Sequence, residues 1–247
     1  MSLVDDAHSY SEYFAVVSAN TPSLLYQAYR LRYQVYCVEN GFEPRPENDI
    51  ETDGYDTRSV HAVLIYRPTG QVCGCVRLIL PAPDSALPIH RTLNDASRNA
   101  FQKYPEAATA EVSRYAVSKT FRRRLGETHT PDVHYFELGA HEHRRMIPHL
   151  TLGLMIATAR LSVRHRMTHV CATMAPALRR LLSAFGMEFL SLGPAIECHG
   201  GRQPCIAALA DLLAGVERRH PAYFDQISRE FRDGCELRDG LEPTGVR

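Results

Sequence analysis

Four separate stretches of the chain carry charged and polar side chains of the types that can bind an amine and a carbonyl group. The stretch 110–117, AEVSRYAV, roughly alternates apolar and polar residues, which predicts a half-buried strand with Glu111 and Ser113 on one face and Arg114 on the other. The other three stretches precede it and contribute Arg32, Tyr36, Phe42, Glu51, Asp53, Asp56 and Arg77. Single ion pairs contribute little, and burying several charges is costly unless the network is complete. The whole set therefore favours a functional site over structural ion pairs.

Such a set suits the formation of an amide from a thioester. That reaction needs a neutral amine, a stabilised carbonyl oxygen and an amine held in line with the carbonyl carbon. An acceptor that resembles an amino acid also needs a cation for its carboxylate and an anion for its ammonium group. The arginines and carboxylates of the four stretches supply both signs of charge.

The first charged stretch is expected on a helix. Thr21 is a suitable N-cap, Pro22 fits the first helical position, and Gly41 can end the helix in a left-handed conformation. Apolar residues recur between them at helical spacing, and Arg32 lies one turn before Tyr36, on the same face. The acidic segment 43–59 that follows is expected to be a substrate-binding loop.

The rest of the chain alternates strands and helices. Strands are predicted at 60–66 and 71–80, joined by a turn at 67–70, and a short helix at 93–103. After the central strand, 148–166 predicts a buried helix, 169–174 a strand, 176–185 a helix closed by Gly186, and 187–192 a strand. Helices are predicted at 206–216 and 221–232. This order predicts one α/β domain, 1–247, with a mixed sheet.

In that order, the four blocks resemble those of the acyl-homoserine lactone (autoinducer) synthases and the related N-acyl amino acid synthases, divergent members of the GNAT acyltransferases. The resemblance implies a GNAT-like three-layer fold with a mixed, splayed central sheet, a core at about 14–218 and a helical extension at 219–247. It implies that Arg32, Tyr36, Phe42, Asp53, Asp56 and Arg77 bind substrate and that Arg114 is catalytic. Glu51 is the expected base, with Glu111 as second choice, and a carboxylate needs a raised pKa for that role. The family usually has tryptophan at the position of Phe42, and this chain has no tryptophan at all.

The second half resembles acyltransferases associated with PEP-CTERM/exosortase systems, a branch beside the autoinducer synthases. The resemblance rests on Ser118 with Phe121 to Arg124, on PHLTLGL at 148–154, on Met174 to Leu182, and on Gly193 to Pro204. It implies that a loop with His199 and Arg202 lines the mouth of an acyl tunnel. GNAT folds splay two strands, so we expect the backbone N–H groups after Arg77, starting with Leu78, to face the acyl carbonyl.

The acyl donor is expected to be acyl carrier protein or coenzyme A, with no permanently bound cofactor. The GNAT diphosphate loop matches poorly at 123–128, RRLGET, which suits a carrier protein with a single phosphate, and the basic run Arg122, Arg123 and Arg124 could dock that acidic partner. The expected function is transfer of a long fatty acyl chain to the amine of an amino acid or similar metabolite. The alternatives are a small-amine acetyltransferase that uses acetyl-CoA and a non-catalytic acyl-binding protein.

Composition excludes other classes of protein. The 28 basic and 28 acidic residues give no basic field for nucleic acid, and no apolar run is long enough to span a membrane. The N-terminus lacks the apolar stretch of a signal peptide, and the seven scattered cysteines suggest reduced thiols, so a cytoplasmic protein is expected. His141-Glu142-His143 is not expected to bind metal, because a His-x-His pair on a helix points its rings apart.

Overall fold

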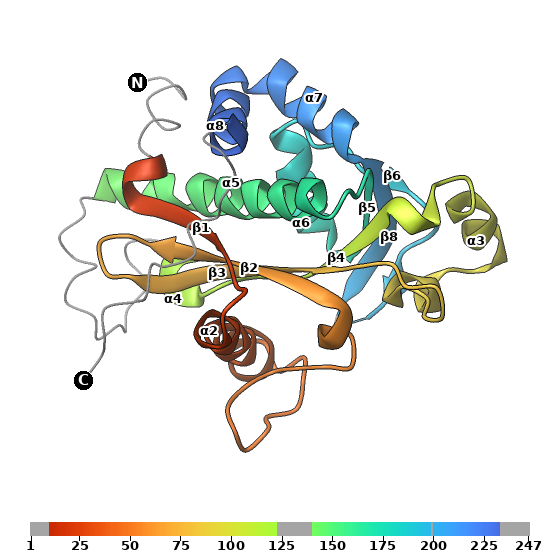
Figure 1. Ribbon diagram of the computed structural model, residues 1–247, viewed down its shortest axis with the longest axis horizontal. Helices are drawn as coiled ribbons and strands as arrows, with labels where there is room; N and C mark the ends of the chain where they lie inside the picture. The colour runs from red at the N-terminus through yellow and green to blue at the C-terminus, as the bar shows by residue number, and fades with distance from the viewer. Residues whose placement is uncertain (1–9, 123–139, 199, 233–247) are drawn as a thin grey trace.

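A mixed sheet of eight strands forms the middle layer of the computed structural model, which describes residues 10–122, 140–198 and 200–232 (Figure 1). The strand order is β1-β2-β3-β4-β5-β8-β6, with β7 paired to β8, and β4 with β5 is the parallel pair. The strands are β1 (Phe14–Ser18), β2 (Ser59–Tyr66), β3 (Gln71–Ile79), β4 (Thr109–Val117), β5 (His169–Met174), β6 (Leu190–Ser191), β7 (Ile196–Glu197) and β8 (Gly201–Ala208).

Helices cover both faces of this sheet. They are α2 (Pro22–Arg32), α3 (Asp95–Phe101), α4 (Lys119–Arg122), α5 (Ala140–Arg164), α6 (Pro176–Ala184), α7 (Leu209–Arg219) and α8 (Pro221–Arg232). Figure 1 shows α5, α7 and α8 on one side of the sheet and α2 on the other. The largest apolar core lies between the sheet and α5 to α8, and a smaller one lies under α2. This arrangement confirms the predicted three-layer fold with a mixed sheet.

The first helix begins as predicted and then widens. The Thr21 hydroxyl accepts a hydrogen bond from the Leu24 N–H at 3.3 Å, and Pro22 is the first helical residue. After Arg32 the chain continues as a π-helix, Tyr33–Glu39, which the sequence did not predict. Gly41 follows with a φ of 63°, the left-handed conformation expected of it.

β4 and β5 lie side by side at one end only. Their paired residues are Thr109 with His169, Ala110 with Val170 and Glu111 with Cys171. Beyond Glu111 the two strands diverge, so the edge of β4 that faces β5 has no partner strand among the described residues. The resemblance implied a splayed pair of strands and placed the free edge after Arg77 on β3. The structure has the splayed pair at β4 and β5, so the free edge lies one strand further along the sheet.

A β-bulge at Arg114 corrects the predicted alternation of β4. On β3 a single residue separates Cys75 from Arg77, whereas their partners on β4, Ala116 and Ser113, are separated by two. The extra residue is accommodated by Arg114, whose φ of 49° is left-handed. Ser113 and Arg114 therefore lie on the same face of the sheet, whereas strict alternation predicted opposite faces.

Several other boundaries differ from the predictions. β1 and β8 were not predicted, and the helix expected from residue 206 begins at Leu209, because 206–208 end β8. Pro204 lies inside β8, where proline usually argues against a strand. The predicted helix 148–166 begins earlier and runs over Ala140–Arg164, and the strand expected at 187–192 is limited to Leu190–Ser191. The helix predicted at 221–232 is confirmed.

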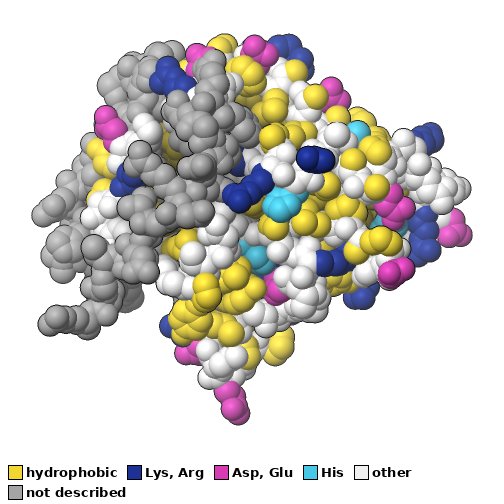
Figure 2. Space-filling model, in the orientation of Figure 1, with side chains coloured by type: hydrophobic (Ala, Val, Ile, Leu, Met, Phe, Trp, Pro, Cys, Tyr) yellow, Lys and Arg dark blue, Asp and Glu magenta, His cyan; other side chains and the backbone are white. Residues whose placement is uncertain are grey.

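The surface of the described residues carries both signs of charge. Figure 2 shows Lys and Arg side chains interspersed with Asp and Glu side chains over the described part of one face. None of the described helices combines the length and the apolar character needed to cross a membrane.

Candidate active site

Three arginines and three carboxylates join α2, the acidic loop, β3 and β4 in a closed ring of ion pairs. Arg32 bonds Glu51 at 2.6 Å and Asp56 at 2.7 Å. Arg77 bonds Asp56 at 2.8 Å and Asp53 at 2.6 Å. Arg114 closes the ring with bonds to Asp53 at 3.1 Å and Glu51 at 2.7 Å. Each carboxylate in this ion-pair ring (Arg32, Glu51, Asp53, Asp56, Arg77 and Arg114) is shared by two arginines.

Most of the ion-pair ring is buried. The Arg32 and Arg77 side chains are only 1% and 2% exposed, and the Glu51 carboxylate is 6% exposed. Burial alone would raise the pKa of Glu51, but hydrogen bonds from Arg114 and Arg32 outweigh burial and lower the pKa below its ordinary value. The same balance, with Arg32 and Arg77, holds the pKa of Asp56 below its usual range. The ring carboxylates are therefore ionised near neutral pH and are poor proton acceptors.

Two further side chains support the ring. His61 on β2 lies 3.5 Å from Asp56, and burial and the Arg32 charge lower the pKa of His61 to about 4, so the ring gains no cation from it near neutral pH. The ring of Tyr36 lies under Arg114, with 5.1 Å from the guanidinium carbon to the ring centroid. Burial raises the pKa of Tyr36 to about 12, so its hydroxyl stays protonated and donates to the Tyr115 carbonyl at 3.4 Å.

Glu111 lies outside the ion-pair ring in a different environment. Its Oε2 accepts a hydrogen bond from the Ile89 N–H at 2.7 Å, and no described residue donates to its Oε1. Burial raises the pKa of Glu111 to about 7, which the Ile89 hydrogen bond and the Arg77 charge only partly offset. A carboxylate with this pKa can accept and release a proton near neutral pH, so Glu111, and not the first choice Glu51, has the properties expected of a base.

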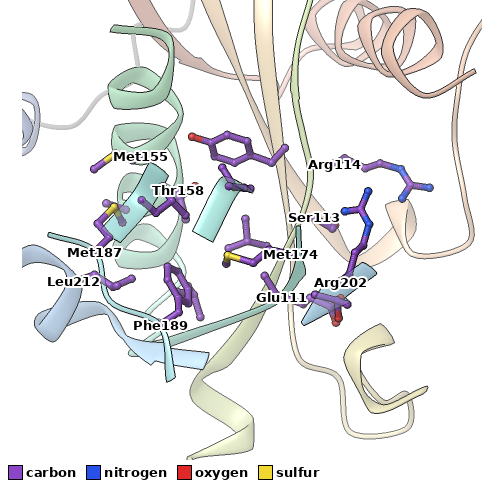
Figure 3. Close-up of a pocket in the computed structure, with 18 of the residues that line it drawn as sticks. Glu111, Ser113, Arg114, Met155, Thr158, Met174, Met187, Phe189, Arg202 and Leu212 are labelled. Atoms are coloured by element: carbon purple, nitrogen blue, oxygen red, sulfur yellow. The ribbon is translucent and has the colours of Figure 1, made fainter. Parts of the chain in front are cut away.

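A cavity of about 300 Å³ opens where β4 and β5 diverge. Glu111, Ser113, Arg114 and Arg202 line one end, and the other end is lined by apolar side chains that include Met155, Met187, Phe189 and Leu212. Figure 3 shows these two groups on opposite sides of the cavity, with Met174 of β5 between them. Of the ion-pair ring, Arg114 is the member that lines the cavity, and the others lie behind it.

The structure corrects the role expected for Leu78. β3 is paired on both sides, with Leu78 opposite Val60 on β2 and opposite Val112 on β4. Its side chain is fully buried, and it does not line the cavity. The unpaired strand edge belongs to β4, at residues 112–115.

The other residues predicted to bind substrate or the acyl donor lie partly at the cavity and partly outside the described residues. Phe42 contacts Arg202, with 5.7 Å from the guanidinium carbon to the ring centroid, and Arg202 lies on β8 and lines the cavity. His199, Arg123 and Arg124 lie outside the described residues, as does the side chain of Arg122 at the end of α4. The predictions made for these four side chains stay predictions.

Sequence reasoning did not single out Glu43. Its carboxylate lies 3.3 Å from Arg114 and lines the charged end of the cavity. Glu43 is the first residue of the acidic segment 43–59 and directly follows Phe42, which was predicted to bind substrate. Ser113 accepts a hydrogen bond from Arg77 at 2.9 Å. It belongs to the charged stretch 110–117, but no role was assigned to its side chain from the sequence. In the described part of the chain no three His, Cys, Asp or Glu side chains are grouped as metal ligands would be.

Comparisons with known proteins bear on the fold that carries this site. Residues 31–130 match the family model of the acetyltransferase (GNAT) domain. The acyl-homoserine-lactone synthase of Aeromonas salmonicida is 37% identical over 62 residues, which are 25% of this chain and 30% of that relative. The match thus spans less than a third of the relative's length.

Two solved structures share the fold over most of their length. BjaI, a CoA-dependent acyl-homoserine lactone synthase, has a TM-score of 0.59 at 19% identity and covers 89% of this chain and 99% of its own. FeeM, an N-acyl amino acid synthase from uncultured soil microbes, has a TM-score of 0.54 at 13% identity and covers 82% of this chain and 93% of its own. These similarities show that the chain has the GNAT fold and resembles acyl-homoserine lactone synthases in sequence and structure.

Proposed function

We propose that this protein is an N-acyltransferase that moves a fatty acyl group from a thioester donor to the amine of an amino acid or a similar small metabolite. The observation that carries the proposal is the two-ended cavity. One end offers a carboxylate of raised pKa, Glu111, and the Arg114 guanidinium, whereas the other end is apolar. A charged acceptor fits the first end and an acyl chain fits the second, so the reacting carbonyl would lie where β4 and β5 diverge.

Glu111 is the proposed base. In its ionised form it takes a proton from the acceptor's ammonium group, and the neutral amine then attacks the thioester carbon. The carbon–nitrogen bond forms, the carbon–sulfur bond breaks, and the departing thiolate takes the second proton from nitrogen. The products are an amide and a thiol, and Glu111 releases its proton to solvent. Backbone N–H groups of 112–115 on the unpaired edge of β4 would stabilise the oxyanion.

Arg32, Asp56 and Arg77 of the ion-pair ring are proposed to position Arg114 and Glu43 rather than to contact substrate. Arg32 and Arg77 use all three of their guanidinium nitrogens within the ring or on Ser113, and both are buried. A complete network of this kind holds the acidic loop against β4 with little freedom. Arg32, Asp56 and Arg77 therefore act through Arg114, which lines the cavity.

The apolar end of the cavity supports an acyl chain longer than acetyl. It draws side chains from five elements, namely α5, β5, α6, α7 and α8, which include Met155, Met174, Leu182, Leu212 and Ile227. Each buried methylene contributes about 0.8 kcal/mol, so a chain that fills this end would be strongly preferred. BjaI is described as CoA-dependent, and coenzyme A and acyl carrier protein are both proposed as donors here.

The test is to express the protein beside its Arg114→Ala and Glu111→Gln variants and to analyse the extracted lipids by mass spectrometry. N-acylated amines should accumulate with the wild-type protein and fall at least a hundredfold with either variant. Accumulation of acetylated amines alone would favour the acetyltransferase alternative. Equal lipids in all three strains, with all three proteins folded, would refute the proposed function.

A further inference from the structure

The ion-pair ring leaves no spare positive charge for an acceptor. Its three arginines face three carboxylates, and Glu43 adds a fourth carboxylate 3.3 Å from Arg114. Arg114 alone has three carboxylates around it, those of Glu43, Glu51 and Asp53. A substrate carboxylate placed beside Arg114 would therefore meet repulsion that offsets the attraction of the guanidinium group.

Among the described residues, Arg202 is the cation lining this cavity that has no carboxylate partner. Its Nε donates to the Cys198 carbonyl at 2.9 Å, which fixes the side chain to its own hairpin between β7 and β8. The ring of Phe42 contacts the guanidinium group and further limits its movement. Within the described residues no carboxylate forms an ion pair with Arg202 and no group accepts from its Nη1 or Nη2. Figure 3 shows Arg202 at the same end of the cavity as Arg114.

We propose that Arg202 binds the carboxylate of the acceptor and so makes the enzyme selective for amines that carry a free carboxylate; the inference rests on the proposed function. An oriented guanidinium group with two free nitrogens can bind a carboxylate through two parallel hydrogen bonds. Glu111 at the same end receives the acceptor's proton, so an amino acid would span Arg202 and Glu111. A simple amine would leave Arg202 without an anion and would bind more weakly.

The other anion that could reach Arg202 is a phosphate of the acyl donor. The position of Arg202 beside Glu111 and Arg114 favours the acceptor, because these groups mark the charged end where the amine reacts. The two sources can be separated with a donor that has no phosphate, acyl-pantetheine, next to the corresponding acyl-CoA.

The experiment compares Arg202→Gln with wild type on matched acceptors, phenylalanine against phenethylamine and leucine against isoamylamine, with decanoyl-CoA and decanoyl-pantetheine as donors. Wild type should prefer the amino acid of each pair, and Arg202→Gln should lower kcat/KM for the amino acid tenfold to a hundredfold through KM, with little change for the amine. Arg202→Lys should restore part of the loss. Arg218→Gln, an exposed arginine on α7, is the matched control and should behave as wild type.

A binding measurement by calorimetry keeps the inference testable without turnover. N-decanoylphenylalanine should bind wild type at least tenfold more tightly than N-decanoylphenethylamine, and Arg202→Gln should remove that difference. Equal affinity of wild type for both ligands would overturn the role of Arg202 while leaving acyl transfer possible. A loss seen with decanoyl-CoA but not with decanoyl-pantetheine would assign Arg202 to the donor instead. Selective binding of the ligand that carries a carboxylate, without any acyl transfer, would refute the proposed function but would leave Arg202 as a carboxylate-binding residue.

Discussion

Replacing Glu111 by glutamine should make the protein more stable above neutral pH while it removes the activity. Burial raises the pKa of Glu111 from its ordinary value of 4.5 to about 7. The unfolded chain therefore releases this proton at lower pH than the folded chain, and between pH 4.5 and pH 7 the unfolded state binds fewer protons. Stability is lost as the pH rises through this window, by about 3 kcal/mol once both states are ionised.

Glutamine removes that loss because its amide does not ionise. Its Oε1 can keep the hydrogen bond from the Ile89 N–H that Glu111 now accepts at 2.7 Å. Relative to wild type, the variant should therefore gain about 3 kcal/mol at pH 8, about 2 kcal/mol at pH 6 and less than about 1 kcal/mol at pH 5. For wild type, kcat/KM should rise with pH up to about 7 and then level off, as the base ionises.

Urea denaturation of both proteins at pH 5, 6, 7 and 8 measures this difference directly. Glu217→Gln, on the exposed side of α7, controls for the loss of one negative charge at the surface. A Glu111→Gln variant that is less stable than wild type at pH 8, or a difference that does not grow with pH, would refute the raised pKa. In that case Glu111 would be an ordinary ionised carboxylate.

Three further predictions concern the ring and the cavity. Arg32→Met should lower the free energy of unfolding by about 3–5 kcal/mol in urea titration, because it leaves Glu51 and Asp56 buried with fewer partners; a loss under 1 kcal/mol would contradict the cooperative ring. Arg114→Ala should lower kcat at least a hundredfold and leave the circular dichroism spectrum unchanged, and activity within a few-fold of wild type would make its role structural. Leu212→Trp, which fills the apolar end of the cavity, should shift the preferred donor to shorter chains by about fourfold in kcat/KM for each methylene excluded; an unchanged chain-length profile would place the acyl chain elsewhere.

The sequence was sufficient to place most elements that carry the site. Clear start and stop signals, such as Thr21, Pro22 and Gly41, predicted the first helix, and alternation predicted the central strand. The arginines and carboxylates of the first half were assigned to one site because their types and spacing match a family. All six members of the ion-pair ring belong to the charged set that the sequence predicted, and Glu111 of the same set lies on the cavity beside the ring.

What the sequence did not predict depends on contacts between distant segments. The bulge that turns Arg114 toward the acidic loop requires a left-handed φ at an arginine, and arginine carries no local signal for that conformation. The raised pKa of Glu111 depends on burial by the segment around Ile89, so composition alone could not rank it above Glu51. Leu78 was chosen because the splayed edge was assigned to β3, whereas strand pairing gives it to β4.

The most direct test of the central claim is a reaction of the purified protein with decanoyl-CoA or decanoyl acyl carrier protein and a mixture of amino acids, followed by mass spectrometry and thiol titration. N-decanoyl amino acids should form in amounts equal to the thiol released, with both signals lost in Glu111→Gln. Thiol release without an N-acyl product, or acetyl-CoA as a better donor than either decanoyl thioester, would contradict the assignment of the two-ended cavity to fatty N-acyl transfer.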